Sequence, residues 1–370
     1  MSPNNSFKLT PLRGAAYFWR KRKRTVNEVT MPIKRSKFPS TLLVLPNSRY
    51  FFRKPQRGSD FLSVVRMIDC AGLATLVITS VGTFGFIFPD TSLLASIDIL
   101  RFTGSGSVPE EVMDNDSAIH SLQEKRVLFM NFVSAAFFGR ACAKAHTSLA
   151  DVLYNGQDKI TAFALTGGNI AVQWIPALNE SVGQKISDFN AGKLNNYILK
   201  DDQIDDGLSY IQHLLQRQND FEYADLQSCM VMNYQAAILH NQQHASASFA
   251  LNFSVMESLA REILTAYGLV DGSAAKPFAT KPHSIPIISR GTFNRMKSIE
   301  VFKTLHDGGL SDHYLHQRLD GARIKRNSLM HKGVSITPKE SGDCQTIVRD
   351  LWALLIDTPF ELNAPWSFRR

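Results

Sequence analysis

The sequence predicts an α+β protein in which a mixed domain of strands and one long helix precedes an all-α helical bundle. Short runs rich in aromatic and β-branched residues dominate the first half, whereas apolar residues recur at helical spacing from about residue 201 onward. The chain has 370 residues, of which 44% are hydrophobic, enough for one large core or two ordinary ones. We expect a basic, disordered tail over 1–46, a mixed domain over 47–200 and the bundle over 201–370.

The strands of the mixed domain are predicted from short apolar runs that end at glycine, proline or asparagine. A loop rich in glycine, serine and proline follows them, and then a long helix that opens near Asp116 or Ser117 and ends near His146. Residues 160–175, broken by Gly167-Gly168-Asn169, resemble a hairpin. The predicted strands before the long helix cover residues 49–52, parts of 70–88, and 97–102.

Residues 70–88 allow two interpretations. This stretch of 19 residues carries no charge, follows a basic flank and is long enough to cross a bilayer as a helix. However, it partly alternates in the strand period, and Gly82 and Gly85 suit turns or bulges between strands. Pro89-Asp90 ends it with a turn signal. We favour one or two buried strands and keep a membrane anchor as the alternative.

The second half of the chain is predicted to be almost entirely helical. Pro277, Pro282 and Pro286 forbid a helix between Gly268 and Gly291. The long helical pattern before this loop has a polar break near Gln242-Gln243. The predicted helices cover residues 202–218, 222–266 with that break, 291–306, 311–332 and 342–357.

The charge of the chain is uneven. Residues 1–66 contain fifteen lysines or arginines and two acids, a balance of +13, which leaves −5 for the rest of a chain whose net charge is +8. The run Arg20–Arg24 would bind RNA or anionic lipid electrostatically. The plainer interpretation is a solvated tail, or an extension translated upstream of a later start at Met31 or Met67. The high pI therefore indicates no basic face on the folded part.

The remaining composition excludes several classes of site. The four cysteines lie far apart and form no CxxC pair, which predicts a reduced, cytoplasmic protein without a zinc ribbon. His240 and His244 have the spacing of zinc ligands, but Asn241 stands where a zinc protease needs its glutamate. His306, His313 and His316 are interpreted as surface residues. No phosphate-binding loop and no Gly-x-Ser-x-Gly occurs, so we expect neither a metal nor a cofactor.

One motif near the C-terminus carries more chemistry. Arg326-Asn327 is followed by three residues and then His331 at the end of a predicted helix, and Lys332-Gly333 come next. The region resembles a HEPN domain, a small helical bundle whose family motif is arginine, a polar residue, a few variable residues and histidine. The upstream helix around 250–259, which contains Glu257, resembles the apolar, glutamate-bearing helix of such domains. The resemblance covers about 40% of the chain.

The resemblance implies a metal-independent endoribonuclease. Arg326 would stabilise charge on the scissile phosphate and His331 would move protons, roles that suit a guanidinium and an imidazole. It also implies a homodimer with a composite site, and a role in prokaryotic defence or as a toxin. Asn327 would share the catalytic site and Glu257 would support it. The residues expected to contact RNA are Arg323, Lys325 and Lys332.

Helix geometry limits how these residues can meet. Positions five apart are separated by about 140° around a helix, so a regular helix does not aim Arg326 and His331 together. Asn327 and His331, four apart, do share a face with Arg323. Either the helix unwinds near Met330, or Arg326 reaches the site obliquely or from a partner chain.

Two simpler interpretations stay open. Cations followed by glycine are what ordinary capping places at a helix C-terminus, and Arg326 would then pair with Asp320 or Glu340. Glu257 and Glu262 would orient Arg326, or form ordinary helical ion pairs. Alternatively, the region is a non-catalytic HEPN-like module for interaction, dimerisation or nucleotide binding.

Overall fold

The computed structural model describes the residues 41–44, 51–52, 64–80, 82, 84–87, 116–145, 153, 161–166, 169–171, 184, 187–188, 190–193, 198–276 and 286–356. The contacts divide the chain into two units, 1–35 and 36–370, and every described residue lies in the second. The predicted strand 97–102 and the glycine-, serine- and proline-rich loop after it lie outside the described residues. In the described part the protein is mostly helical and contains an antiparallel sheet, as an α+β class requires.

The sheet has the strand order β2-β3-β4-β1-β5-β6, and each neighbouring pair with a recorded register is antiparallel. The hairpin predicted over 160–175 is confirmed by the pairing of β5 with β6. β1 begins inside residues 1–46, so strand structure starts before the expected end of the basic tail. The strands are β1 (Thr41–Val44), β2 (Val64–Asp69), β3 (Thr75–Thr79), β4 (Phe84–Ile87), β5 (Thr161–Thr166) and β6 (Asn169–Ala171).

The uncharged segment 70–88 forms strands, as the favoured interpretation predicted. β3 and β4 pair as a hairpin, with Thr75 opposite Ile87. Gly82 lies in the turn between them with φ 79°, a left-handed conformation that costs glycine no steric penalty. Among the described residues, no helix is both long and apolar enough to cross a membrane.

The helices occur close to their predicted places. The 3-10 helix η2 (Gln218–Asp220) follows α6, and the break near Gln242-Gln243 separates α7 from α8. The helices are α4 (Asp116–Ala145), α6 (Asp201–Arg217), α7 (Leu226–Asn241), α8 (Ala245–Ala266), α9 (Arg290–Phe293), α10 (Ser298–Asp307), α11 (His313–Lys332) and α12 (Pro338–Leu355).

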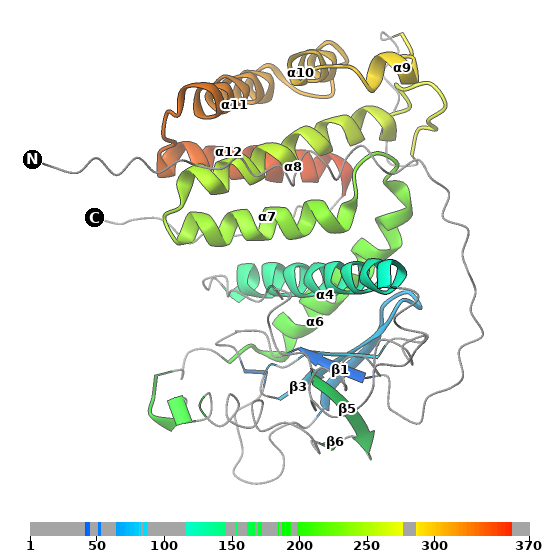
Figure 1. The fold of residues 1–370 in the computed structure, drawn as a ribbon, viewed down its shortest axis with the longest axis vertical. Helices are drawn as coiled ribbons and strands as arrows, with labels where there is room; N and C mark the ends of the chain where they lie inside the picture. The colour runs from blue at the N-terminus through cyan, green and yellow to red at the C-terminus, as the bar shows by residue number, and fades with distance from the viewer. Residues whose placement is uncertain are drawn as a thin grey trace, which may run out of the picture. The chain divides into compact units, whose positions relative to one another are not determined.

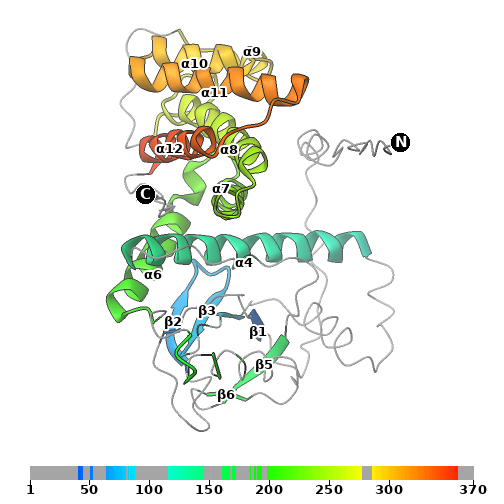
Figure 2. The same cartoon turned by 90° about the vertical axis from the view of Figure 1, so that its left-hand side faces the viewer.

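Figures 1 and 2 show α4 between the sheet and helices α7 to α12, with α6 beside α4 and reaching toward the sheet. On the sheet side, Phe137 and Phe138 of α4 pack edge-on and stacked against Phe84 of β4, with ring centroids 5.1 and 5.2 Å apart. On the other side α4 contacts α7, and α7 contacts α8. One cluster of buried apolar residues runs from Phe84 to Trp352 of α12. The sheet and the helices therefore share a continuous core.

Helix α6 approaches α4 closely because Gly207 has no side chain. A Cβ at this position would lie 2.8 Å from Cδ2 of Phe137, closer than real Cβ contacts. Two ion pairs flank the contact: Arg140 Nε of α4 binds Asp206 Oδ2 at 2.7 Å, and Arg66 Nε of β2 binds Asp205 Oδ1 at 3.0 Å. The start of α6 is thereby tied to both α4 and the sheet.

Helix α8 is the centre of the C-terminal helices and contacts α7, α10, α11 and α12. Its Glu262 is 1% exposed, and its carboxylate accepts the backbone N–H groups of Glu222, Tyr223 and Ala224 at 3.0, 2.6 and 2.7 Å. Burial raises the pKa of Glu262, against the lowering effect of these hydrogen bonds. The carboxylate thus fixes the loop that leads into α7.

The neighbouring Arg261 determines where α9 ends. Its guanidinium donates to the carbonyl oxygens of Phe293, at 3.0 Å, and Met296. Lys297 is extended, and its N–H bonds to the Glu300 side chain at 2.6 Å to begin α10. The single helix predicted over 291–306 is therefore wrong: a buried arginine binds carbonyls at the break between α9 and α10.

Replacing Glu262 should destabilise the fold strongly. Glu262→Ala leaves three N–H groups without their acceptor, that of Ala224 buried and the other two part-buried, and a buried group left unpaired costs roughly 1–3 kcal/mol. We expect a loss of about 3 kcal/mol or more in the free energy of unfolding, measured by urea denaturation. Glu262→Gln keeps one acceptor oxygen and should lose less.

The comparison variant is Glu257→Gln, on the same helix, whose carboxylate is 32% exposed and accepts one hydrogen bond from Ser298. It should cost about 1 kcal/mol. Equal losses for Glu262→Ala and Glu257→Gln would contradict the role assigned to Glu262.

Candidate functional site

The motif predicted from the sequence lies in the last two turns of α11. This helix begins at Asp312, whose side chain accepts the N–H of Leu315 at 2.6 Å, and continues without a break to Lys332. It packs against α8, α10 and α12. Figure 1 shows α11 beside α10 on one side of α8.

The end of α11 is capped as the sequence predicts. Gly333 adopts φ 65°, and the N–H groups of Gly333 and Val334 bond to the carbonyls of Leu329 and Ser328 at 3.2 and 3.3 Å. The helix therefore does not unwind near Met330. Unwinding of the helix therefore does not bring Arg326 and His331 together. An oblique approach of Arg326 and a contribution from a partner chain are the two ways left.

Arg326 turns toward the bundle. Its guanidinium lies over the ring of Phe253 on α8, 5.7 Å from the centroid, and the residue is half-buried. Its Nη1 donates to Oδ1 of Asn327 at 3.2 Å. The arginine and asparagine of the motif are thus joined, with the guanidinium held from one side by an aromatic ring.

His331 lies on a different face of the helix. Its side chain is exposed, and no described residue forms a hydrogen bond or ion pair with its ring. Because α11 is regular, Arg326 and His331 stay about 140° apart around the axis. In a single chain, therefore, the ring of His331 is exposed, whereas the guanidinium of Arg326 packs against Phe253 and donates to Asn327.

Two of the basic residues expected to contact RNA already have carboxylate partners. Arg323 Nε binds Asp320 Oδ1 at 2.7 Å, and Lys325 Nζ binds Glu340. The bond from Lys325 lowers the pKa of Glu340 to about 2. Arg326 does not pair with Asp320 or Glu340, so that expectation is wrong.

Lys332 is exposed at the end of the helix, beside His331. Glu257, expected to support the site, faces α10 instead. Its Oε1 accepts the Ser298 hydroxyl at 2.9 Å and lies 3.7 Å from Arg261. In the described part of the chain, neither Glu257 nor the buried Glu262 forms a hydrogen bond or ion pair with Arg326.

Exposed apolar side chains surround the motif, a feature that the sequence reasoning missed. Ile324, Met330 and Val334 are 51%, 60% and 50% exposed. On the helical wheel, Ile324 and Met330 flank the stripe of Asn327 and His331. Apolar residues beside an otherwise polar stripe were the available signal, because exposed apolar residues that form a contiguous patch mark an interaction face.

The two groups of histidines that the sequence analysis considered lie at helix junctions. His240 is half-buried, and its Nδ1 lies 3.1 Å from the hydroxyl of Ser341, which donates to Ser248 at 2.9 Å, whereas His244 is exposed at the start of α8. The polar patch predicted at this helix break therefore joins α7, α8 and α12.

The rings of His306 and His316 stack with centroids 4.6 Å apart, and His313 lies 5.9 Å from His306. His313 is exposed and the other two are half-buried, so none of the three belongs to the buried core. No group of histidines, cysteines and carboxylates in the described part of the chain is arranged to hold a metal ion.

Comparisons with protein-family models, curated proteins and solved structures find no match to this chain.

The stability of the helices should depend on pH through His240. Burial lowers the pKa of this imidazole from its usual value of 6.5. Protonation is then easier in the unfolded chain, so the contribution of the neutral ring is present above that value and is lost as the pH falls below it. We expect the free energy of unfolding, measured by urea denaturation, to decline from pH 7 to pH 5.

His240→Gln keeps a hydrogen-bonding side chain beside Ser341 but cannot titrate, so it should flatten this decline. The control is His244→Gln, four residues on at an exposed position. If both variants show the same pH dependence, His240 does not carry the effect.

Proposed function

We propose that this protein is a metal-independent endoribonuclease of the HEPN type. The observation that carries the proposal is the exposed His331 in the last turn of α11, one turn after the hydrogen-bonded pair of Arg326 and Asn327. The motif lies at the end of a helix within a group of packed helices. This is the setting that the resemblance to a HEPN domain implies for it.

The residue types suit phosphodiester cleavage without a metal. The neutral imidazole accepts a proton near pH 7 and the imidazolium returns it, so His331 serves as the general base or acid. A guanidinium binds two oxygens of one phosphate at once, which suits Arg326 for the charge that develops on the scissile group. Asn327 Oδ1 holds the guanidinium in orientation through Nη1.

The active unit that we propose is a homodimer in which each site combines residues from both copies. Arg326 and His331 diverge on the regular helix of one chain, so a second motif has to complete the arrangement. The exposed Ile324, Met330 and Val334 provide apolar area around the motif for a symmetric contact. Lys332 would then lie near the bound RNA, with Arg323 and Lys325 further along the same helix.

The biological role that follows from the resemblance is prokaryotic defence or toxicity, with the helices as effector. In that arrangement the part that contains the sheet would sense or position a trigger. The sheet and the helices share one core, so a conformational change at the sheet would alter the packing of α4 and then of α7 and α8. These contacts are the physical route by which a trigger at the sheet would reach the helices.

Cleavage of RNA in the presence of EDTA tests the activity. Wild-type protein should cut RNA, and His331→Ala and Arg326→Ala should each lower the rate by roughly a hundredfold or more, the range that one acid–base group contributes. Arg326→Lys keeps the cation over Phe253 but loses the planar fork, so it should remain folded and still be slow.

The matched control is His313→Ala, an exposed histidine in the first turn of the same helix. It should cleave like wild type. Wild-type protein that cuts none of a panel of RNAs, tRNA and phage-infected extracts included, would remove the proposal.

Mixing two inactive variants tests the composite site. Combining Arg326→Ala with His331→Ala chains forms mixed dimers in which one of the two sites receives an intact arginine and an intact histidine. Random pairing should therefore restore roughly a quarter of wild-type activity. No recovery after exchange of subunits, in a mixture that mass spectrometry shows to contain mixed dimers, would indicate that each site lies within one chain.

A non-catalytic HEPN-like module for dimerisation is the second candidate. It is favoured by the packing of Arg326 against Phe253 and by the ordinary capping at Gly333, which explains His331 and Lys332 without chemistry. Absence of cleavage, together with a dimer in analytical ultracentrifugation that Met330→Glu dissociates, would select this module.

A further inference from the structure

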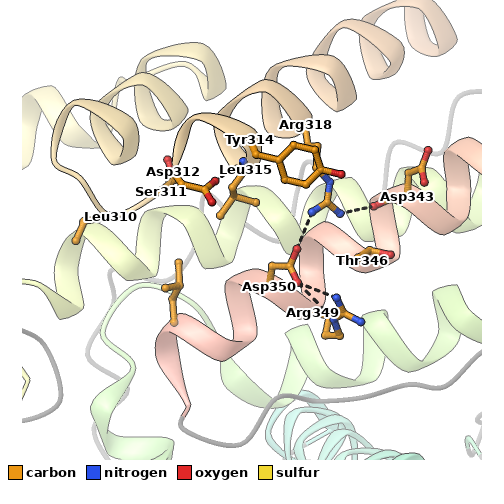
Figure 3. A pocket seen from close by; sticks show the side chains of 11 residues that line it. Leu310, Ser311, Asp312, Tyr314, Leu315, Arg318, Asp343, Thr346, Arg349 and Asp350 are labelled. Carbon is orange, nitrogen blue, oxygen red and sulfur yellow. Dashed lines mark hydrogen bonds and ion pairs between the residues drawn. The ribbon is translucent and has the colours of Figure 1, made fainter.

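A hollow lies at the other end of α11 from the motif, between the first turns of this helix and α12. Its volume is about 560 Å³. Figure 3 shows Tyr314 and Arg318 of α11 on one side of it and Asp343, Thr346 and Asp350 of α12 on the other. We call this hollow the α11–α12 pocket.

The charges of the pocket disfavour an anionic ligand. Of the described residues, two arginines and three aspartates line it. Arg318 Nη1 and Arg349 Nη2 both donate to the carboxylate of Asp350, at 2.7 and 3.1 Å. The carboxylates of Asp312 and Asp343 then outnumber the positive charge that remains, so the pocket has a negative excess and spare hydrogen-bond acceptors. A phosphate or carboxylate on the ligand would add to this excess.

Asp343 presents two carboxylate oxygens beside a free N–H donor. Its backbone carbonyl accepts Arg318 Nη2 at 3.4 Å, which places the guanidinium next to this residue. Asp343 is exposed, and its carboxylate forms no hydrogen bond or ion pair with a described residue. Because each terminal nitrogen of arginine carries two hydrogens, Arg318 Nη2 keeps one N–H for a ligand. Two acceptors and one donor therefore lie close together.

The walls of the pocket suit a flat ligand with apolar faces. The ring of Tyr314 is 67% exposed, and the guanidinium carbon of Arg318 lies 5.2 Å from its centroid. A centred stack brings carbon atoms to about 4 Å, so the guanidinium covers only part of the ring face. A planar ligand edge to edge with the guanidinium would cover the rest of that face. Apolar lining comes from Leu310, Leu315 and Leu354, which pack against the core.

The order of donors and acceptors selects one nucleobase. Guanine presents N2–H, N1–H and O6 along one edge, two donors followed by an acceptor. Two carboxylate oxygens and one N–H are the complementary set. Adenine, cytosine and uracil each offer a single donor on this edge with an acceptor next to it, and that acceptor would face a carboxylate oxygen. A simple ammonium would match one carboxylate but would use neither the arginine N–H nor the apolar walls.

We propose that the α11–α12 pocket binds a guanine base. The carboxylate of Asp343 accepts N1–H and N2–H, Arg318 Nη2 donates to O6, and the ring of Tyr314 stacks on the base. Guanosine in solution and a guanine in single-stranded RNA present the same edge. The pocket lies away from Arg326 and His331, so binding of the base does not require the proposed cleavage.

Isothermal titration of the full chain with nucleosides tests the proposal. Guanosine carries the complete edge, inosine lacks only the amino group at position 2, and adenosine has an acceptor where guanosine has N1–H. Guanosine should give saturable binding. Inosine should bind roughly tenfold more weakly, because it loses one bond to a charged group, and adenosine should bind more weakly still.

The 2′-O-methyl pentanucleotides UUGUU and UUUUU separate the two sources of the base. UUGUU that binds more tightly than UUUUU identifies single-stranded RNA as the source. Equal binding of the two pentanucleotides by a chain that binds guanosine identifies the free nucleoside. Both results support a guanine site, and neither depends on cleavage, because the 2′-hydroxyl groups are blocked.

Variants with matched controls locate the binding. Asp343→Asn turns one acceptor oxygen into an N–H donor at nearly constant shape, and it should weaken guanosine binding roughly tenfold or more. Asp307→Asn, at an exposed aspartate outside the pocket, should leave the affinity unchanged. Tyr314→Ala should lose about tenfold with the missing ring, whereas Tyr314→Phe, which keeps the ring, should bind like wild type.

Three results would overturn the proposal: no heat with guanosine at two temperatures, equal affinity for inosine and guanosine, or equal effects of Asp343→Asn and Asp307→Asn. Putrescine serves as a cationic probe without a base. Putrescine binding that Asp343→Asn weakens, in a chain that does not bind guanosine, would indicate a cation site and contradict the assignment of guanine.

Discussion

The buried carboxylate of Glu262 is the interaction on which the arrangement of the C-terminal helices depends. It accepts three consecutive backbone N–H groups from the loop 222–224, and it lies on a helix that contacts four others. Next to it, Arg261 binds the carbonyls at the end of α9. Two residues adjacent in sequence therefore bind the two kinds of backbone group: the glutamate accepts N–H groups, and the arginine donates to carbonyl oxygens. Each avoids the high cost of an unpaired charge in a dry core.

This arrangement determines the direction in which the motif faces. Once α8 is held, Phe253 presents its ring to α11, and Arg326 is drawn onto it. His331 then remains on the outer side, among exposed apolar residues. An aromatic contact between two helices therefore sets the direction of Arg326, and the spacing on a regular helix sets His331 apart from it. A composite site across two copies is the consequence that we propose.

Helix α11 also links two surfaces of different chemistry. Its first turns carry a capping aspartate, a buried serine and an arginine shared with α12, and its last turns carry the motif. The histidine stack at the turn between α10 and α11 lies beside the first of these surfaces.

The sequence by itself determined the local features. Glycine positions, turn dipeptides and apolar periodicity predicted the strands within 70–88, the hairpin near 160–175, the break at Gln242-Gln243 and the cap at Gly333, because backbone preferences act over a few residues. The early start of α12 was also readable, since Thr337, Pro338 and Glu340 form a capping box. The apolar pattern, which predicts this helix from residue 342, begins one turn later.

Only the tertiary structure decided which side chains meet. Glu262 finds its partners 38 to 40 residues away, and His240 finds Ser341 at a separation of 101. The same holds for the division of 291–306 into α9 and α10, which depends on Arg261 of α8. Such pairings depend on how buried helices pack, and their energies come from desolvation at the contact. The apolar periodicity of the sequence indicates neither how the helices pack nor which polar groups are desolvated at their contacts.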